Sequence, residues 1–234
     1  MKPLTAHLLL ILLVGAQVPQ RSRANPAPHF HDPLAQQASP SPATPSKSQK
    51  IANPLNDLLD EAQQAIDKSN FQAAIPPLQK FLAEQPDVAY AHFQLAYTYT
   101  ALKRSDDAQA EYQRAITLDP KMSEAYLNLG ILLIEKDPAA AIAPLRKAVD
   151  LRPSESRPRV LLGAAQERSG ELAAAAESLE SAVRLDPRDS EALRHLGNLY
   201  LRLQRPADAE AKFRRALEIQ PNSPAAALDR KSVV

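Results

Sequence analysis

Cysteine and tryptophan are absent from the 234 residues, and glycine, with five residues, and aromatic side chains, at 5%, are scarce. The absence of cysteine excludes disulfides, zinc–thiolate sites, thiol nucleophiles and a cysteine-linked lipid anchor. The residues that dominate instead, such as alanine, leucine, glutamine, glutamate and arginine, lose little conformational freedom on entering a helix. The composition therefore predicts an all-α fold.

The chain also lacks a block of charge of one sign, and its formal net charge is only +1. Nucleic-acid-binding proteins attract phosphates through clustered positive charge, and so do proteins that bind anionic membranes. We therefore expect no nucleic-acid partner and no membrane attachment through bulk charge.

Residues 1–16 have the layout of a secretory signal peptide. Lys2 precedes an apolar run from Leu8 to Val14, and the small residues Gly15 and Ala16 follow it. The apolar run is short for a transmembrane helix, so cleavage near Ala16 and export to the periplasm or the medium are predicted. The alternative is that the segment stays uncleaved and anchors the protein in the inner membrane.

Residues 17–52 are predicted to be a disordered linker. Prolines stand among alanine, serine, glutamine and threonine, at positions 19, 26, 28, 33, 40, 42 and 45. Such a segment buries too little apolar surface to offset the entropy lost on ordering. His29, His31 and Asp32 are close in the sequence, but they lack further ligands on a fixed frame. We expect no metal and no cofactor.

The rest of the chain is built from a repeat of about 34 residues. Five similar phrases, the second of which is AEYQRAITLDP, end at Pro86, Pro120, Pro153, Pro187 and Pro221. In each phrase a large apolar residue stands eight positions before the proline: Leu78, Tyr112, Leu145, Leu179 and Phe213. Self-similarity at this period is typical of solenoid proteins.

A small residue marks a second position of the repeat. Ala96, Gly130, Gly163 and Gly197 each stand ten residues after a proline of the series. Glycine inside a helix costs about 1 kcal/mol relative to alanine, so its recurrence requires a packing reason. The pattern predicts that a neighbouring helix approaches closely at this position.

The repeat resembles the tetratricopeptide repeat (TPR), whose pattern is W-x2-L-G-x2-Y, then A-x3-F, then P. The second unit matches through Leu95, Ala96, Tyr99, Ala108, Tyr112, Ala115 and Pro120. The resemblance implies a TPR α-solenoid over residues 53–221, with units 55–88, 89–122, 123–155, 156–189 and 190–223. It further implies a right-handed superhelix whose first helices line a concave groove, followed by a partial capping helix and tail over residues 222–234.

Boundary signals divide every unit into two helices. Asn53-Pro54, Ser123, Ser156 and Ser190 are predicted to start the first helices, because short polar side chains cap free N–H groups and proline suits the first turn. The third unit is one residue shorter than the others. The missing residue is predicted to fall in the turn between Glu135 and Pro138, where its loss leaves the register of both helices intact.

The candidate site is the stripe of the first helices that is distinct from the stripe packing the units together. It carries Tyr90, Phe93, Tyr97, Leu127, Ile131, Arg157, Val160, Arg194, Asn198 and Arg202. This surface would accept an apolar or amphipathic peptide whose acidic end lies near Arg157, Arg168, Arg194 and Arg202. The alternatives are that the aromatic residues belong to the core and that the arginines form a solvated helix face.

The repeat region offers no residues arranged for catalysis. Its two histidines, His92 and His195, are three units apart, and it contains no glycine-rich phosphate loop. We therefore expect a non-enzymatic scaffold that binds a protein or a peptide. The alternative is a structural or self-associating subunit of a cell-envelope assembly.

Overall fold

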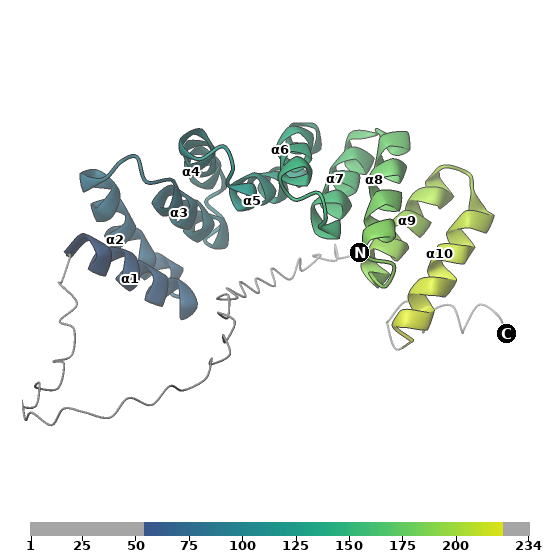
Figure 1. The fold of residues 1–234 in the computed structure, drawn as a ribbon, viewed down its shortest axis with the longest axis horizontal. Coiled ribbons are helices and arrows are strands. Elements are labelled where there is room, and N and C mark those ends of the chain that lie inside the picture. The colour runs from purple at the N-terminus through teal and green to yellow at the C-terminus, as the bar shows by residue number, and fades with distance from the viewer. Residues whose placement is uncertain (1–53, 222–234) are drawn as a thin grey trace, which may run out of the picture. The chain divides into compact units, whose positions relative to one another are not determined.

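The computed structural model describes residues 54–221, and within this range all regular secondary structure is α-helical (Figure 1). The predicted signal peptide, the proline-rich linker and the C-terminal capping segment lie outside the described residues. The helices are α1 (Pro54–Asp67), α2 (Phe71–Glu84), α3 (Ala89–Ala101), α4 (Ser105–Leu118), α5 (Ser123–Ile134), α6 (Pro138–Leu151), α7 (Ser156–Ser169), α8 (Leu172–Leu185), α9 (Ser190–Arg202) and α10 (Pro206–Ile219).

The ten helices pack as five antiparallel pairs in one curved row (Figure 1). Each helix contacts the one before it and the one after it. The first helices also contact each other across units, α3 with α5, α5 with α7 and α7 with α9. Helices on the inner side of a curved row are closer together than those on its outer side, so these contacts place the first helices on the inner side. Figure 1 shows this arrangement for α3 and α5. The predicted TPR α-solenoid is confirmed.

The core follows the repeat position that precedes each proline by eight residues. Leu78, Tyr112, Leu145 and Leu179 are all fully buried. A helix pair of this size is marginal alone, because its apolar stripe faces water. Stacking covers that stripe, and each buried side chain of this kind contributes about 1.5–3 kcal/mol. Stability is therefore a property of the stack.

The recurring glycines lie against this core position. A Cβ atom added to Gly163 would stand 2.7 Å from Cγ of Leu179, and one added to Gly197 would stand 2.6 Å from Cε1 of Phe213. Gly130 faces Leu145 in the same way. The predicted close approach of a neighbouring helix is confirmed.

Four of the five turns between paired helices contain one residue in the left-handed backbone conformation, with positive φ. Ser69, Lys103 and Gln204 have φ between 56° and 60°, and Gly170 has φ of 90°. All four occupy the same repeat position. The shorter third unit lacks a residue at this point, and α6 begins instead at Pro138 behind Asp137, whose carboxylate accepts from the Ala140 N–H at 3.0 Å. The predicted place of the deletion is confirmed.

The predicted starts of the first helices are confirmed at Pro54, Ser123, Ser156 and Ser190, but the predicted capping by the serines is wrong. Ser123, Ser156 and Ser190 are the first residues of α5, α7 and α9, and the preceding Met122, Glu155 and Asp189 hold the N-cap positions. Each N-cap lies one residue before the serine, so the serine side chain is past the point from which it can cap. Of these three N-caps only Asp189 makes a side-chain bond, from the Ala192 N–H at 2.9 Å.

The first described helix, α1, has a polar outer side. Asp57, Asp60 and Gln64 are exposed on α1. The equivalent residues of the next unit, 34 positions later, are Ala91, Gln94 and Thr98, and these are buried where α3 meets α2. Carboxylates at two of the positions that are buried in the next unit disfavour an apolar neighbour on this side of α1.

Candidate partner-binding face

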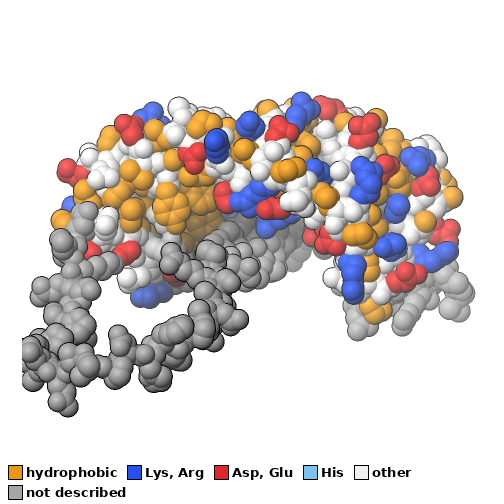
Figure 2. Space-filling model, in the orientation of Figure 1, with side chains coloured by type: hydrophobic (Ala, Val, Ile, Leu, Met, Phe, Trp, Pro, Cys, Tyr) orange, Lys and Arg blue, Asp and Glu red, His pale blue; other side chains and the backbone are white. Residues whose placement is uncertain are grey.

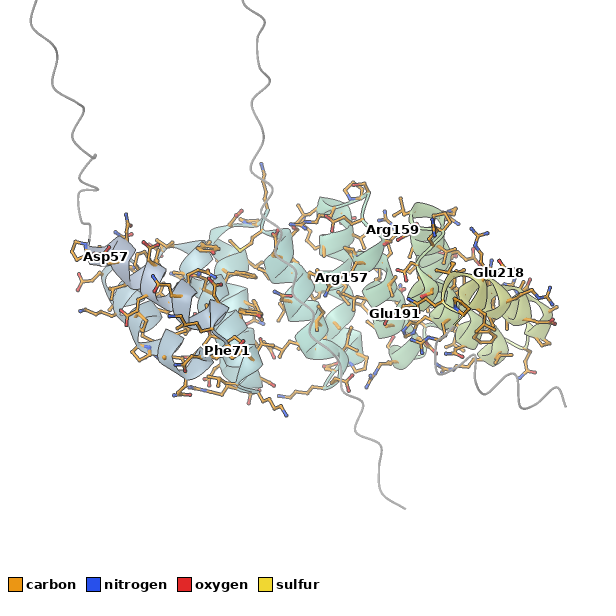
Figure 3. The ribbon with its side chains drawn as sticks, turned by 90° about the horizontal axis from the view of Figure 1, so that it is seen from below. Asp57, Phe71, Arg157, Arg159, Glu191 and Glu218 are labelled. Carbon is orange, nitrogen blue, oxygen red and sulfur yellow. The ribbon has the colours of Figure 1, made fainter. Side chains whose placement is uncertain are left out.

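The predicted site residues fall on the inner helices α3, α5, α7 and α9, but their surroundings divide them into two groups. Figure 3 shows Phe71 near the α1–α4 end of the row and Arg157 farther along it, on α7. In Figure 2 hydrophobic side chains gather over the α2–α4 part of the row, whereas positive and negative side chains mix over its other end.

Aromatic rings form the first group. The Tyr90 and Phe93 rings stack with centroids 6.4 Å apart, and Phe93 packs on the buried Tyr112 at 6.0 Å. Tyr97 meets Phe71 of α2 edge-on, also at 6.0 Å. Spacing of this kind stabilises aromatic pairs beyond their buried area. We call Phe71, Tyr90, Phe93 and Tyr97 the aromatic face.

These rings serve both the core and the surface. Phe93 is half-buried and packs against the main core, and Tyr97 is also half-buried. Burial raises the pKa of the Tyr97 hydroxyl. Tyr90, in contrast, keeps 51% of its surface exposed. Packing thus holds the rings in place while Tyr90 remains accessible to a partner.

Next to these rings lies a polar network that the repeat pattern did not reveal. Nε2 of Gln94 donates to Oε1 of Gln63 at 2.7 Å and to the Tyr90 hydroxyl at 3.3 Å. Nε2 of Gln63 donates in turn to Asp67 at 2.7 Å. Gln94 is only 4% exposed, yet its Oε1 atom has no hydrogen-bond donor within the described residues. An unpaired buried acceptor costs about 1–3 kcal/mol, so this network is incomplete as it stands.

Aliphatic residues continue the surface beyond the aromatic face. Leu127 and Ile131 of α5 and Val160 of α7 are half-buried. Leu127 and Val160 pack against the core, so their exposed atoms have fixed positions. The result is an apolar strip that runs from α3 through α5 to α7.

The arginines form the second group, and two of the four are already paired across units. Arg202 reaches Oε1 of Glu167 at 2.7 Å. The Arg168 guanidinium donates to both carboxylate oxygens of Glu135, at 2.8 and 3.1 Å. Lys136 forms a similar ion pair with Asp106 of the preceding unit. Its hydrogen bond and its positive charge lower the pKa of the Asp106 carboxyl. These pairs link neighbouring units.

Arg157 and Arg194 differ from the paired arginines. Both are exposed, on α7 and α9, and within residues 54–221 neither makes an ion pair or a side-chain hydrogen bond. Asn198 lies one turn beyond Arg194 and is also exposed. A guanidinium with free donors is suited to a carboxylate supplied by another molecule.

The described residues hold no cluster of three or more histidine or acidic side chains that could bind a metal ion. Over the same range, no helix is both long and apolar enough to cross a membrane.

Comparisons with known proteins agree with this architecture. The tetratricopeptide repeat family matches residues 59–121, 99–156 and 160–224. The type IV pilus assembly protein PilF of Pseudomonas aeruginosa is 28% identical over 145 residues, which are 59% of this chain and 56% of PilF. Human protein O-mannosyl-transferase TMTC3 is 25% identical over 171 residues, 66% of this chain but only 19% of the transferase. The chain thus spans a part of each of these relatives.

Solved structures share the fold. A crystal structure of MamA superposes with a TM-score of 0.67 at 26% identity, covering 71% of this chain and 92% of MamA. YrrB, described as a TPR protein with an unusual peptide-binding site, gives 0.67 at 20% identity and covers 74% of this chain and 90% of its own. With five stacked helix pairs and family matches over most of its length, the chain belongs to the tetratricopeptide repeat family.

Proposed function

We propose that this protein is an exported, non-catalytic scaffold that holds a segment of a partner protein along its inner helices. The observation that carries the proposal is the order of surfaces on those helices. The exposed Tyr90 and the half-buried Leu127 and Ile131 come first, and the unpaired Arg157 and Arg194 follow. A segment with apolar residues at one end and a carboxylate at the other matches this order.

The relatives favour the same reading. YrrB carries a peptide-binding site on the same fold, and PilF acts in type IV pilus assembly, as their names state. We do not extend the transferase activity of TMTC3 to this chain, because the match covers 19% of that protein. Export remains part of the proposal and rests on residues 1–16.

Site-specific photocrosslinking in the native host tests the binding face. A photoreactive phenylalanine analogue at position 90 should capture one defined partner, and the same analogue at position 185 is the matched control. Leu185 is 43% exposed, similar to Tyr90, but lies on α8. Arg157→Glu combined with Arg194→Glu should reduce capture at position 90 severalfold. Equal capture from positions 90 and 185 would rule out the inner helices as the binding face.

Export has its own test. The intact mass of the protein recovered from the periplasm or the medium should correspond to a chain that begins near residue 17. Recovery of the unprocessed chain from the inner membrane would instead support the uncleaved anchor.

The alternative function is a structural subunit that associates with itself. Its supporting observation is Leu201, which is 49% exposed on α9 of the last unit. Light scattering over a range of concentrations separates the two functions. A mass that rises with concentration, and no longer rises in Leu201→Ser, would favour self-association.

A further inference from the structure

The apolar strip of α3, α5 and α7 belongs to two parallel rows of side chains on the inner helices. Residues at one repeat position form the first row, namely Leu59, Phe93, Leu127, Val160 and Arg194. Residues four positions later form the second row, namely Gln63, Tyr97, Ile131, Ala164 and Asn198. We infer that the partner segment is an amphipathic α-helix that lies along these rows, with its N-terminus toward α1 and its C-terminus toward α9. This inference deepens the proposed function and rests on it.

The middle of both rows is apolar and held in place. In the first row Phe93, Leu127 and Val160 are half-buried and pack against the core. In the second row the residues one turn farther along the same three helices are half-buried as well. Among these six side chains the Tyr97 hydroxyl is the one polar group. A partner segment that covers them therefore meets a surface with almost no capacity for hydrogen bonds.

Such a surface favours a partner that satisfies its own main chain. An extended segment would leave without partners the N–H and C=O groups that face the strip, and each unpaired buried group costs about 1–3 kcal/mol. The interior groups of an α-helix are already paired within the helix. A helix therefore covers the strip at a lower desolvation cost than an extended chain does.

The spacing between units agrees with a helix. α3, α5, α7 and α9 contact each other in succession, and helices in contact lie about 8–10 Å apart. Residues seven apart on a partner helix are separated by about 10.5 Å along its axis, so one heptad advances by about one unit. Residues on the same side of a β-strand recur at about 7 or about 13 Å, and neither distance matches the units.

The width of the strip also agrees with a helix. Residues four apart on one helix, such as Phe93 and Tyr97, have Cβ atoms about 5–6 Å apart. The apolar stripe of an amphipathic helix is two residues wide, because it is formed by positions i and i+3 or i+4. Each heptad of the partner can thus supply one apolar side chain to each row.

Charge favours one direction of the partner helix. α1 carries four carboxylates and neither lysine nor arginine, whereas α7 carries three arginines and one glutamate, and α9 two arginines and one glutamate. Figure 3 shows Asp57 at the α1 end of the row and Arg157 farther along it. A helix carries about half a positive charge at its N-terminus and about half a negative charge at its C-terminus. Its N-terminus is therefore attracted to α1, and its C-terminal carbonyl groups to the free donors of Arg157 and Arg194.

Two synthetic peptides of equal composition, each about 20 residues long, test the conformation against the full-length chain. The heptad peptide has leucine at the first and fourth positions of each heptad. The second peptide has the same leucines at every third position, where they line one face of an extended polyproline II helix. Both peptides end in glutamates.

Fluorescence anisotropy of the labelled peptides measures their affinity. The heptad peptide should bind about tenfold more tightly than the second peptide, which corresponds to the cost of one unpaired buried group. Equal affinities, a preference for the second peptide, or no binding of either peptide up to about 1 mM would overturn the inference.

Substitutions in the chain show whether the heptad peptide lies on the strip. Ile131→Ser removes apolar surface from the second row and should weaken the heptad peptide about tenfold. Leu185→Ser, on the exposed side of α8, is the matched control and should leave the affinity unchanged. Urea denaturation confirms that both variants are folded. Equal effects of the two substitutions would place the peptide elsewhere and overturn the inference.

A third peptide tests the direction. It is the heptad peptide with its glutamates moved to the N-terminal end, where they stabilise an isolated helix. Its affinity should nevertheless be severalfold lower, because these glutamates reach the arginines only if the helix dipole is reversed. Arg157→Gln with Arg194→Gln should reduce the difference between the two peptides. An equal or higher affinity of the third peptide would overturn the direction.

The photocrosslinking result is separate from these measurements. If both proposals hold, the segment crosslinked at position 90 carries apolar residues at heptad spacing. If position 90 captures a defined partner while the heptad peptide is not preferred, the helical partner fails and the proposed function stands. If the heptad peptide is preferred while positions 90 and 185 capture equally, the proposed function fails and the preference of the strip for a helix stands.

Discussion

Gly163 on α7 and Leu179 on α8 are in contact so close that a Cβ atom on the glycine would lie 2.7 Å from the leucine Cγ. The carbonyl oxygen of Ala175 would lie 3.3 Å from the same Cβ. Leu179 is fully buried and cannot move aside. The small residue therefore sets the distance between the two helices of the unit.

Gly163→Ala should lower the free energy of unfolding by about 1–3 kcal/mol, because overpacking outweighs the better helix propensity of alanine. Urea denaturation measures the change. Adding Leu179→Ala should cost less than the sum of the two single changes. An increase in stability for Gly163→Ala alone would show that the helices are free to separate.

At the left-handed turn position a change of side chain to glycine is expected to stabilise the protein, whereas the change at Gly163 destabilises it. Lys103 has φ of 60° and an exposed side chain between α3 and α4. Lys103→Gly should raise the free energy of unfolding by about 0.5 kcal/mol, since glycine relieves the steric cost of this conformation and loses part of the gain to its entropy. Gly170→Ala should destabilise by about 1 kcal/mol, although no atom lies within 4 Å of the added Cβ.

A control for this turn is available in the third unit. Lys136 stands in the shortened turn, which contains no residue with positive φ. Lys136→Gly should therefore give no stabilisation. A gain equal to that of Lys103→Gly would mean that the effect does not come from φ.

Substitution of the unpaired arginines should weaken partner binding, whereas substitution of the paired arginines should mainly lower stability. Arg157→Gln with Arg194→Gln should leave the free energy of unfolding within about 0.5 kcal/mol and weaken the partner severalfold. Arg168→Gln with Arg202→Gln should instead remove up to about 1 kcal/mol per exposed ion pair and affect binding less. Thermal unfolding and crosslinking yield at position 90 are the two measurements. Identical effects of the two double variants would contradict the distinction.

Stability at high pH should depend on Tyr200 and Glu180. The Tyr200 hydroxyl donates to Oε1 of Glu180 at 2.7 Å, and burial, aided by this carboxylate, raises the tyrosine pKa to about 12. The folded state thus favours the neutral phenol, whose pKa in the unfolded chain is about 10. The contribution is fully present below pH ~10 and is lost as the pH rises to about 12.

Tyr200→Phe provides the comparison. The stability difference between the unaltered chain and Tyr200→Phe should be constant below pH ~10 and shrink above it. Urea titrations at about pH 9 and pH 11.5 measure this difference. Parallel loss of stability in the two proteins would show that other groups account for the pH dependence.

The candidate site was predictable in part. Its residues lie on the inner helices because helical periodicity assigns them to one stripe, and this is a property of the sequence alone. The sequence left open whether Phe93 belongs to the core, and it did not indicate that Gln63 and Gln94 form a network next to Tyr90. The contact between Gln63 and Gln94 joins residues 31 positions apart, and its geometry depends on how two units are rotated against each other.

The sequence by itself determined the fold, the number of units, the place of the one-residue deletion and the position at which paired helices approach most closely. These follow from a period repeated five times, and each copy confirms the others. Only the tertiary structure decided that Arg168 and Arg202 are paired while Arg157 and Arg194 are not, and that aspartate rather than serine caps α9. The reason is that ion pairs and caps depend on the atomic spacing between neighbouring units and turns, which a repeat pattern leaves open.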